Sequence, residues 1–370
     1  MLPGNLHLYD PSVRVFGSPS RYVQGPQAID RLGAIGATLG TELIILADHA
    51  VFQVVGEKIV HSCASAGLPF QHLLFDGELD PETGSNLLRT VKLAAGTVIA
   101  AVGGGRTIDA GKAMVELCRL PLITVPTVAS NDAPTSKNFV LYDAGHRLLE
   151  VRHLPVNPAF VLVDTGILAA APRKFFVAGL GDAIAKKFEA ENCFSSSGLN
   201  MFGASPSRAA LAVARHCYEQ LIANGVEACR LAGTGQVTVP FEETVEAMLL
   251  MAGLGFESGG LSIAHALTRG LSITRGAKTA AHGLQVAYAL LVQFALEGRP
   301  PPPELLEFYR NVGLPMSLAE IGVTSPDTSD FTKIATATVG VRHMSNFPRK
   351  ISEREMIEAI MEVERRHASV

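Results

Sequence analysis

Short apolar runs alternate with helical patterns from residue 21 to residue 165, and this alternation constrains the fold more than any other feature. Strands separated by helices pair in parallel through crossover connections, so the pattern predicts βαβ units and a Rossmann-like, doubly wound parallel sheet. The expected strands lie at residues 21–24, 42–47, 71–75, 97–102, 122–125 and 160–164.

The pattern changes after the last of these strands, because the chain becomes alanine-rich and helical from about Pro172. We therefore expect an α/β domain at residues 1–165 and an all-helical domain at residues 166–370. Ligands of open α/β sheets bind beyond the carboxyl ends of the strands, so we expect the site in a cleft between the two domains. The expected helices lie at residues 183–193, 208–224, 242–254, 264–268, 283–296 and 304–312.

Composition narrows the class of protein. The 370 residues are 48% apolar and 18% charged, which is typical of a globular chain, and a net charge of −4 without a basic run argues against nucleic-acid binding. The five cysteines form no Cys-x-x-Cys pair and indicate reduced thiols. The chain shows no signal peptide and no stretch of about 18 apolar residues. We therefore expect a cytoplasmic protein with no membrane partner.

Three residues suggest a metal site. His265 ends the glycine-rich run GLGFESGGLSIAH, His282 follows seventeen residues later, and Asp182 lies in an earlier glycine-rich segment. Imidazole and carboxylate ligands together suit zinc or ferrous iron, and three protein ligands leave one position open for a substrate oxygen. Histidines at such long spacing are also common as surface or core residues, so the spacing alone leaves both interpretations open.

Three further features suggest a nucleotide cofactor. The turn Gly103-Gly-Gly105 follows a strand and opens a helix whose free amides suit a pyrophosphate, although it is neither a Walker A loop nor a Gly-x-Gly-x-x-Gly motif. Asp48 ends another strand, where a carboxylate favours NAD over NADP; it could equally cap the next helix. The loop PTVASNDAPTS carries Asp132 and could line the nicotinamide and a polyol, or be an ordinary turn.

These motifs occur together in one known family. The chain resembles the glycerol dehydrogenases of the iron-containing alcohol dehydrogenase and dehydroquinate synthase-like superfamily over about residues 14–322. The segments that carry the resemblance are SPSRYVQG (18–25), GGGRTID (103–109), PTVASNDAPTS (126–136), GLGD (179–182), GLGFESGGLSIAH (253–265) and AHG (281–283).

The resemblance implies oxidation of glycerol to dihydroxyacetone, and of related vicinal diols, by hydride transfer from a metal-bound alkoxide to NAD. It implies a metal ion, normally zinc, on Asp182, His265 and His282, and a substrate contact from Asp132. It also implies that the chain forms a homo-oligomer. The NAD contacts that it implies are Asp48, Gly104, Gly105, Arg106, Thr107, Asp109, Thr127, Ser130, Ser136, Asn138 and Tyr142.

The chain also departs from the family pattern. Lys186 stands four residues after Asp182, where iron-dependent relatives place a further histidine, and this favours zinc over iron. One alternative is a dehydroquinate synthase-like lyase, for which Arg269 and Arg275 could bind a substrate phosphate. A dehydrogenase of another small polyol or hydroxy acid is a second alternative. A third is an NAD-binding regulatory protein without activity, which the intact candidate ligands disfavour.

Overall fold

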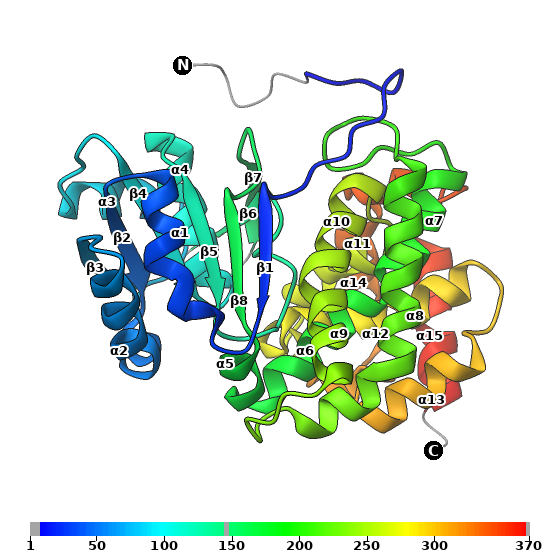
Figure 1. The fold of residues 1–370 in the computed structure, drawn as a ribbon. Helices are drawn as coiled ribbons and strands as arrows, with labels where there is room; N and C mark the ends of the chain where they lie inside the picture. The colour runs from blue at the N-terminus through cyan, green and yellow to red at the C-terminus, as the bar shows by residue number, and fades with distance from the viewer. Residues whose placement is uncertain (1–7, 144–147, 368–370) are drawn as a thin grey trace. The chain divides into compact units, whose positions relative to one another are not determined.

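The computed structural model describes residues 8–143 and 148–367, and Figure 1 shows its ribbon. The chain forms two compact units. The sheet unit comprises Ser18–Phe176 and Leu231–Leu250, and the helical unit comprises Val177–Arg230, Met251 onward and the described residues up to Gly17.

A six-stranded sheet forms the centre of the sheet unit, with its strands in the order β1-β8-β5-β4-β2-β3. Every neighbouring pair is parallel, which confirms the predicted fold class. The inner strands β4 and β5 are buried along their whole length, which explains why their sequences are continuous apolar runs. The strands are β1 (Arg21–Gly25), β2 (Glu42–Ala47), β3 (Phe70–Leu74), β4 (Thr97–Gly103), β5 (Leu122–Pro126) and β8 (Phe160–Asp164).

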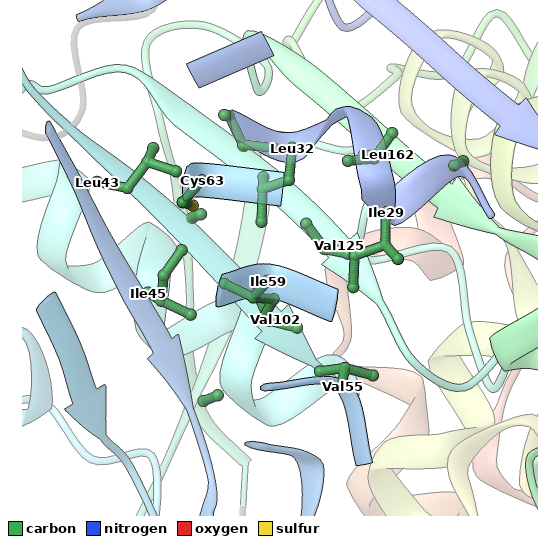
Figure 2. Packing of buried hydrophobic residues seen from close by; sticks show 14 of the residues in the cluster. Ile29, Leu32, Leu43, Ile45, Val55, Ile59, Cys63, Val102, Val125 and Leu162 are labelled. Atoms are coloured by element: carbon green, nitrogen blue, oxygen red, sulfur yellow. The ribbon is translucent and has the colours of Figure 1, made fainter. Parts of the chain in front are cut away.

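Helices cover both faces of this sheet. Successive side chains of a strand point to opposite faces, so Leu43 and Ile45 enter one core cluster while Ile44 and Leu46 enter the other. Figure 2 shows the first cluster, to which Ile59 of α2 contributes. The helices are η1 (Ala28–Arg31), α1 (Leu32–Leu39) and α2 (His49–Ser65) at the first cluster, α3 (Thr83–Thr90) and α4 (Gly105–Cys118) at the second, and α5 (Thr165–Ala170) after β8.

A separate antiparallel pair, β6 (Asn138–Tyr142) with β7 (Leu148–His153), follows the loop after β5. The sequence did not predict this pair. β7 is partly exposed and carries charged residues, and Arg152 forms ion pairs with Glu150 and with Glu116 of α4. One of its contacts therefore joins residues distant in sequence, which local periodicity does not reveal.

Helices make up the regular structure of the helical unit, as the sequence predicts, but α14 and α15 lie beyond the last predicted helix. No single helix of the described residues is long and apolar enough to cross a membrane. Of these helices, only the bent pair Val239–Gly259 and Ile263–Ser272, taken together, has the length and the apolar composition for this. The elements are α6 (Arg173–Ile184), α7 (Lys186–Ser195), α8 (Arg208–Leu231), α10 (Ala252–Gly259), α11 (Ile263–Ser272), η3 (Ala277–Thr279), α12 (His282–Leu296), α13 (Pro303–Val312), η4 (Ala319–Ile321), α14 (Thr328–Val339), η5 (Arg342–Asn346) and α15 (Glu353–His367).

The two units are not separated by a single boundary at residue 165, because the sheet unit also includes Leu231–Leu250. Helix α9 (Val239–Glu246) belongs to the sheet unit and leads into the π-helical turn η2 (Ala247–Met251). The Glu242 carboxylate accepts hydrogen bonds from Thr165 Oγ1 and Gln24 Nε2, both at 2.6 Å. Side-chain contacts across more than 70 residues thus join α9 to the sheet unit, and a boundary read from local composition cannot anticipate them.

Candidate active site

The three predicted metal ligands come together in the helical unit. Asp182 lies near the end of α6, His265 lies in α11, and His282 begins α12. Each offers one ligand atom, and these atoms lie within 4.8 Å of one another. Asp182 Oδ1 and His265 Nε2 are 3.2 Å apart, and the two imidazole centroids are 5.5 Å apart.

Glycines next to two of the ligands allow this convergence. A Cβ atom on Gly181 would lie 2.4 Å from the carbonyl oxygen of Gly283. A Cβ atom on Gly283 would lie 1.8 Å from the carbonyl oxygen of Ala178. No larger residue fits at these distances, so the glycines let the backbones of α6 and α12 touch where Asp182 and His282 project.

Glu189 of α7 orients His265, a role that we did not predict from the sequence. Its carboxylate lies 2.5 Å from His265 Nδ1 and also accepts the backbone N–H groups of Ser262 and His265. Burial alone would raise the pKa of Glu189, but the charge and hydrogen bond of His265 and the charge of Lys186 lower it. The ionised carboxylate accepts the Nδ1 proton and turns Nε2 toward Asp182, as second-sphere carboxylates do at metal-binding histidines. Glu189 is two helical turns after Asp182, a spacing that could have indicated it.

Lys186 lies inside this cluster. Its Nζ atom is 2.9 Å from Asp182 Oδ1 and 3.0 Å from His265 Nε2, and its side chain is 1% exposed. Burial would raise the pKa of Asp182, but the charge of Lys186 and the contacts with His265 lower it below its usual range. Lys186 therefore lies directly beside Asp182, although a break at Ala185 places the two residues on successive helices.

The two histidines differ in their surroundings. Burial and the Lys186 charge lower the pKa of His265, but the Glu189 charge and the hydrogen bonds with Asp182 and Glu189 together outweigh them and leave the pKa above its usual value. Desolvation by surrounding protein lowers the pKa of His282; the Asp182 charge opposes this effect, and the His265 and Lys186 charges add to it. The shift favours the neutral imidazole, which is the form that binds a metal ion, and His282 is exposed to solvent.

The side chains fit a divalent metal ion in type and spacing. Two imidazoles and one carboxylate form the donor set of many catalytic zinc sites. Ligand atoms about 2.0–2.2 Å from one tetrahedral ion lie about 3.3–3.6 Å apart, close to the 3.2 Å between Asp182 Oδ1 and His265 Nε2. Asp182, His265 and His282 would therefore be the residues that hold the ion.

In the sheet unit, the glycine turn and the loop after β5 lie together. Thr127 N donates to the carbonyl oxygen of Gly103 at 3.1 Å. A Cβ atom on Gly105 would lie 2.6 Å from Asn131 Nδ2, and one on Gly104 would lie 3.3 Å from Val128 Cγ2. Gly104 caps α4 without a side chain, so the first amides of α4 face a glycine-lined surface. Such a surface suits a pyrophosphate.

Two residues of the implied NAD set take part in a buried network that holds this loop. Lys112 is fully buried, and its Nζ atom donates to the carbonyl oxygens of Ala133 and Asn138 and lies 3.3 Å from Asp109 Oδ1. Asp109 Oδ2 also accepts the backbone N–H of Val140. The Asp109 carboxylate therefore binds the chain itself, and any contribution to cofactor binding would act through the loop.

The other implied residues have varied surroundings. Asp48 Oδ1 accepts the N–H of Val51 at 2.7 Å, so Asp48 caps α2, as the alternative interpretation of the sequence expected. Arg106 is exposed and forms an ion pair with Glu78. Asp132 is 8% exposed in the loop after β5. Thr127 and Ser136 are also buried, as is Thr107, while Ser130 and Tyr142 are half-buried.

Known proteins resemble this chain over nearly its whole length. The family model described as iron-containing alcohol dehydrogenase matches residues 19–165. The glycerol dehydrogenase of Thermotoga maritima is 37% identical over 351 residues, which cover 94% of this chain and 96% of that protein. The glycerol dehydrogenase of Citrobacter freundii is 35% identical over 352 residues, with the same coverage. The solved glycerol dehydrogenase structure from Schizosaccharomyces pombe superposes with a TM-score of 0.91 and 32% identity, covering 96% of this chain and 92% of that chain.

The fold and these similarities define an oxidoreductase. The relatives match both units rather than the sheet unit alone, so the helical unit with its candidate ligands is part of the similarity. The chain belongs to the iron-containing alcohol dehydrogenase family.

Proposed function

We propose that the protein oxidises glycerol and related vicinal diols with NAD, using a divalent ion, zinc, held by Asp182, His265 and His282. The convergence of these three side chains, in a chain similar to glycerol dehydrogenases over 94% of its length, is the observation that carries the proposal. The same similarity favours a dehydrogenase over a dehydroquinate synthase-like lyase, and the complete donor set argues against an inactive regulatory protein.

The reaction balances as a two-electron oxidation. The hydrogen on C2 of glycerol leaves as a hydride to the nicotinamide, and the hydroxyl proton leaves to solvent, which gives dihydroxyacetone, NADH and a proton. A divalent ion bound at the site would supply a Lewis acid that lowers the pKa of an alcohol hydroxyl. Glu189 holds the His265 ring in one tautomer and orientation, so that its Nε2 lone pair remains available.

Nucleotide binding would rest on the sheet unit. The amides at the start of α4 would bind the pyrophosphate, and the glycines would allow its close approach. Asp48 would accept a hydrogen bond from the adenosine ribose and repel a 2′-phosphate, since one oxygen can cap α2 while the carboxylate keeps its charge. These roles favour NAD over NADP.

We also propose a cytoplasmic location and a homo-oligomeric assembly. The five cysteines, all within the described residues, form no disulfide bond, and four of them are buried, which suits the reducing cytoplasm. A homo-oligomer is the assembly that the family resemblance implies, and light scattering after size-exclusion chromatography would measure it.

Asp132 provides the test of the substrate. A simple alcohol and a diol each offer one reacting hydroxyl, so selectivity for diols needs a group that pairs with the second one. An ionised carboxylate is a strong acceptor, and losing one such hydrogen bond costs about 1.5–3 kcal/mol, or about ten- to over a hundredfold in kcat/KM. We expect Asp132→Asn to reduce kcat/KM for glycerol and 1,2-propanediol by this factor and to affect 1-propanol much less.

The assay follows NADH absorbance with the zinc-loaded enzyme and the three alcohols. An equal loss with all three would show that Asp132 supports the fold or the metal centre instead. Failure of the unaltered enzyme to oxidise any diol with NAD would contradict the proposed function itself.

A further inference from the structure

Lys186 is the residue of the metal cluster that the proposed function leaves unexplained. It begins α7, and only Ala185 separates it from the end of α6, which carries Asp182. Its Nζ atom contacts Asp182 Oδ1 and His265 Nε2, and it also lies 5.1 Å from the ring centroid of Phe256. A flexible cationic side chain is thus held, fully buried, against two of the three candidate ligands.

The atoms that Lys186 contacts are the ones that a metal ion would need. Glu189 accepts the proton on Nδ1 of His265, so Nε2 is the nitrogen of this ring that can offer a lone pair. A nitrogen lone pair cannot accept a hydrogen bond from Lys186 and bind an ion at the same time. Lys186 Nζ also contacts Oδ1 of Asp182, which is itself one of the three candidate ligands. Ion binding therefore requires Lys186 to give up at least its contact with His265.

The Lys186 amine lies among acidic groups and beside an aromatic ring. Two buried carboxylates, Asp182 and Glu189, contribute negative charge, and the Phe256 ring lies within the range of a cation–π contact. An ammonium group balances this charge without an ion. A divalent cation entering the same cluster would be repelled by it, and such repulsion is strong between groups shielded from water.

We propose that Lys186 sets the metal affinity of this site: its ammonium group competes with the divalent ion for Asp182 and His265. The three ligands thus bind zinc more weakly than they would without the lysine. This inference rests on the proposed metal site. Lys186 acts here on ion binding and is not assigned a catalytic role.

Zinc affinity measured on metal-stripped protein tests the inference without any activity assay. Competition with a chromophoric chelator would give Kd for the unaltered protein and for Lys186→Met, which keeps most of the length of the side chain and removes its charge. We expect Lys186→Met to bind zinc about 10- to 100-fold more tightly, the scale on which residues around metal ligands change affinity. Lys187→Met is the matched control, because Lys187 contacts the Phe188 and Tyr218 rings instead, and its Kd should not change.

Two further variants separate the possible outcomes. His282→Ala should lose zinc binding; if it binds like the unaltered protein, the proposed metal site is wrong. If His282→Ala fails to bind but Lys186→Met binds no more tightly than the unaltered protein, the inference about Lys186 is wrong. Weaker binding by Lys186→Met would show that the amine is itself a ligand, which also overturns the inference. Lys186→Gln, checked by circular dichroism, replaces the methionine variant if that variant does not fold.

Discussion

The metal cluster and the glycine turn use side chains in opposite ways. In the helical unit, the atoms that would do the chemistry are the side-chain atoms of Asp182, His265 and His282. In the sheet unit, the surface suited to a cofactor consists of backbone at the start of α4, and Asp109 binds the protein's own backbone and Lys112. Residue type therefore indicates a metal site directly, whereas it indicates a nucleotide site mainly through glycine.

This contrast predicts different sensitivities to mutation. The metal cluster should fail when a ligand, or the helix spacing that positions it, changes. The cofactor surface should tolerate a side-chain change that keeps the local hydrogen bonds. Such a change should alter the preference between NAD and NADP and leave cofactor binding itself intact.

The largest effect is expected from Gly283→Ala. A Cβ atom 1.8 Å from the Ala178 carbonyl oxygen forces α6 and α12 apart, so zinc binding and nearly all turnover should be lost. Zinc content and melting temperature would measure the change. Gly340→Ala is the control, because its Cβ atom would meet nothing within 4 Å. Normal zinc content in Gly283→Ala would show that the helix contact does not position the ligands.

A smaller effect is expected from Glu189→Gln. The amide oxygen can still accept the Nδ1 proton of His265 but lacks the charge, so zinc affinity should fall about tenfold, within the 10- to 100-fold range typical of such positions. Glu191→Gln removes a carboxylate from the same helix, where it pairs with Arg215, and should leave affinity unchanged. Equal Kd values for both variants would argue against the orienting role.

The smallest effect is expected from Asp48→Asn. Asparagine caps helices about as well as aspartate, so the cap of α2 and the stability should remain. Loss of the negative charge should raise kcat/KM with NADP and narrow the preference for NAD, by about tenfold if one charge contact of about 1.4 kcal/mol is involved. The ratio of kcat/KM values for the two cofactors measures this. An unchanged ratio would mean that Asp48 serves the helix alone.

Much of the fold was predictable because its main signals are local. The six parallel strands lie within about one residue of their predicted positions, since each is a short apolar run between helical segments. The β6–β7 pair and the return of α9 to the sheet unit were not predicted. Their contacts, such as Arg152 with Glu116 and Glu242 with Thr165, join residues far apart in the chain.

The candidate site was predictable to a similar extent. Glycine-rich segments singled out Asp182, His265 and His282, and the structure brings these residues together. Helical spacing from Asp182 points to Lys186 and Glu189, but their contacts with His265 depend on how α7 packs beside α11, which spacing does not give. Asp48 shows the opposite case, because one residue can satisfy both of the interpretations that the sequence left open.

The most direct test of the three-ligand metal centre is the zinc content of purified protein, measured by plasma emission spectroscopy beside glycerol oxidation. After incubation with zinc and removal of excess, the unaltered protein should hold about one ion per chain. His265→Ala and His282→Ala should each lose most of that zinc and at least about a thousandfold of turnover, because two remaining ligands bind a catalytic ion poorly. Full zinc content and full activity in either variant would contradict the account.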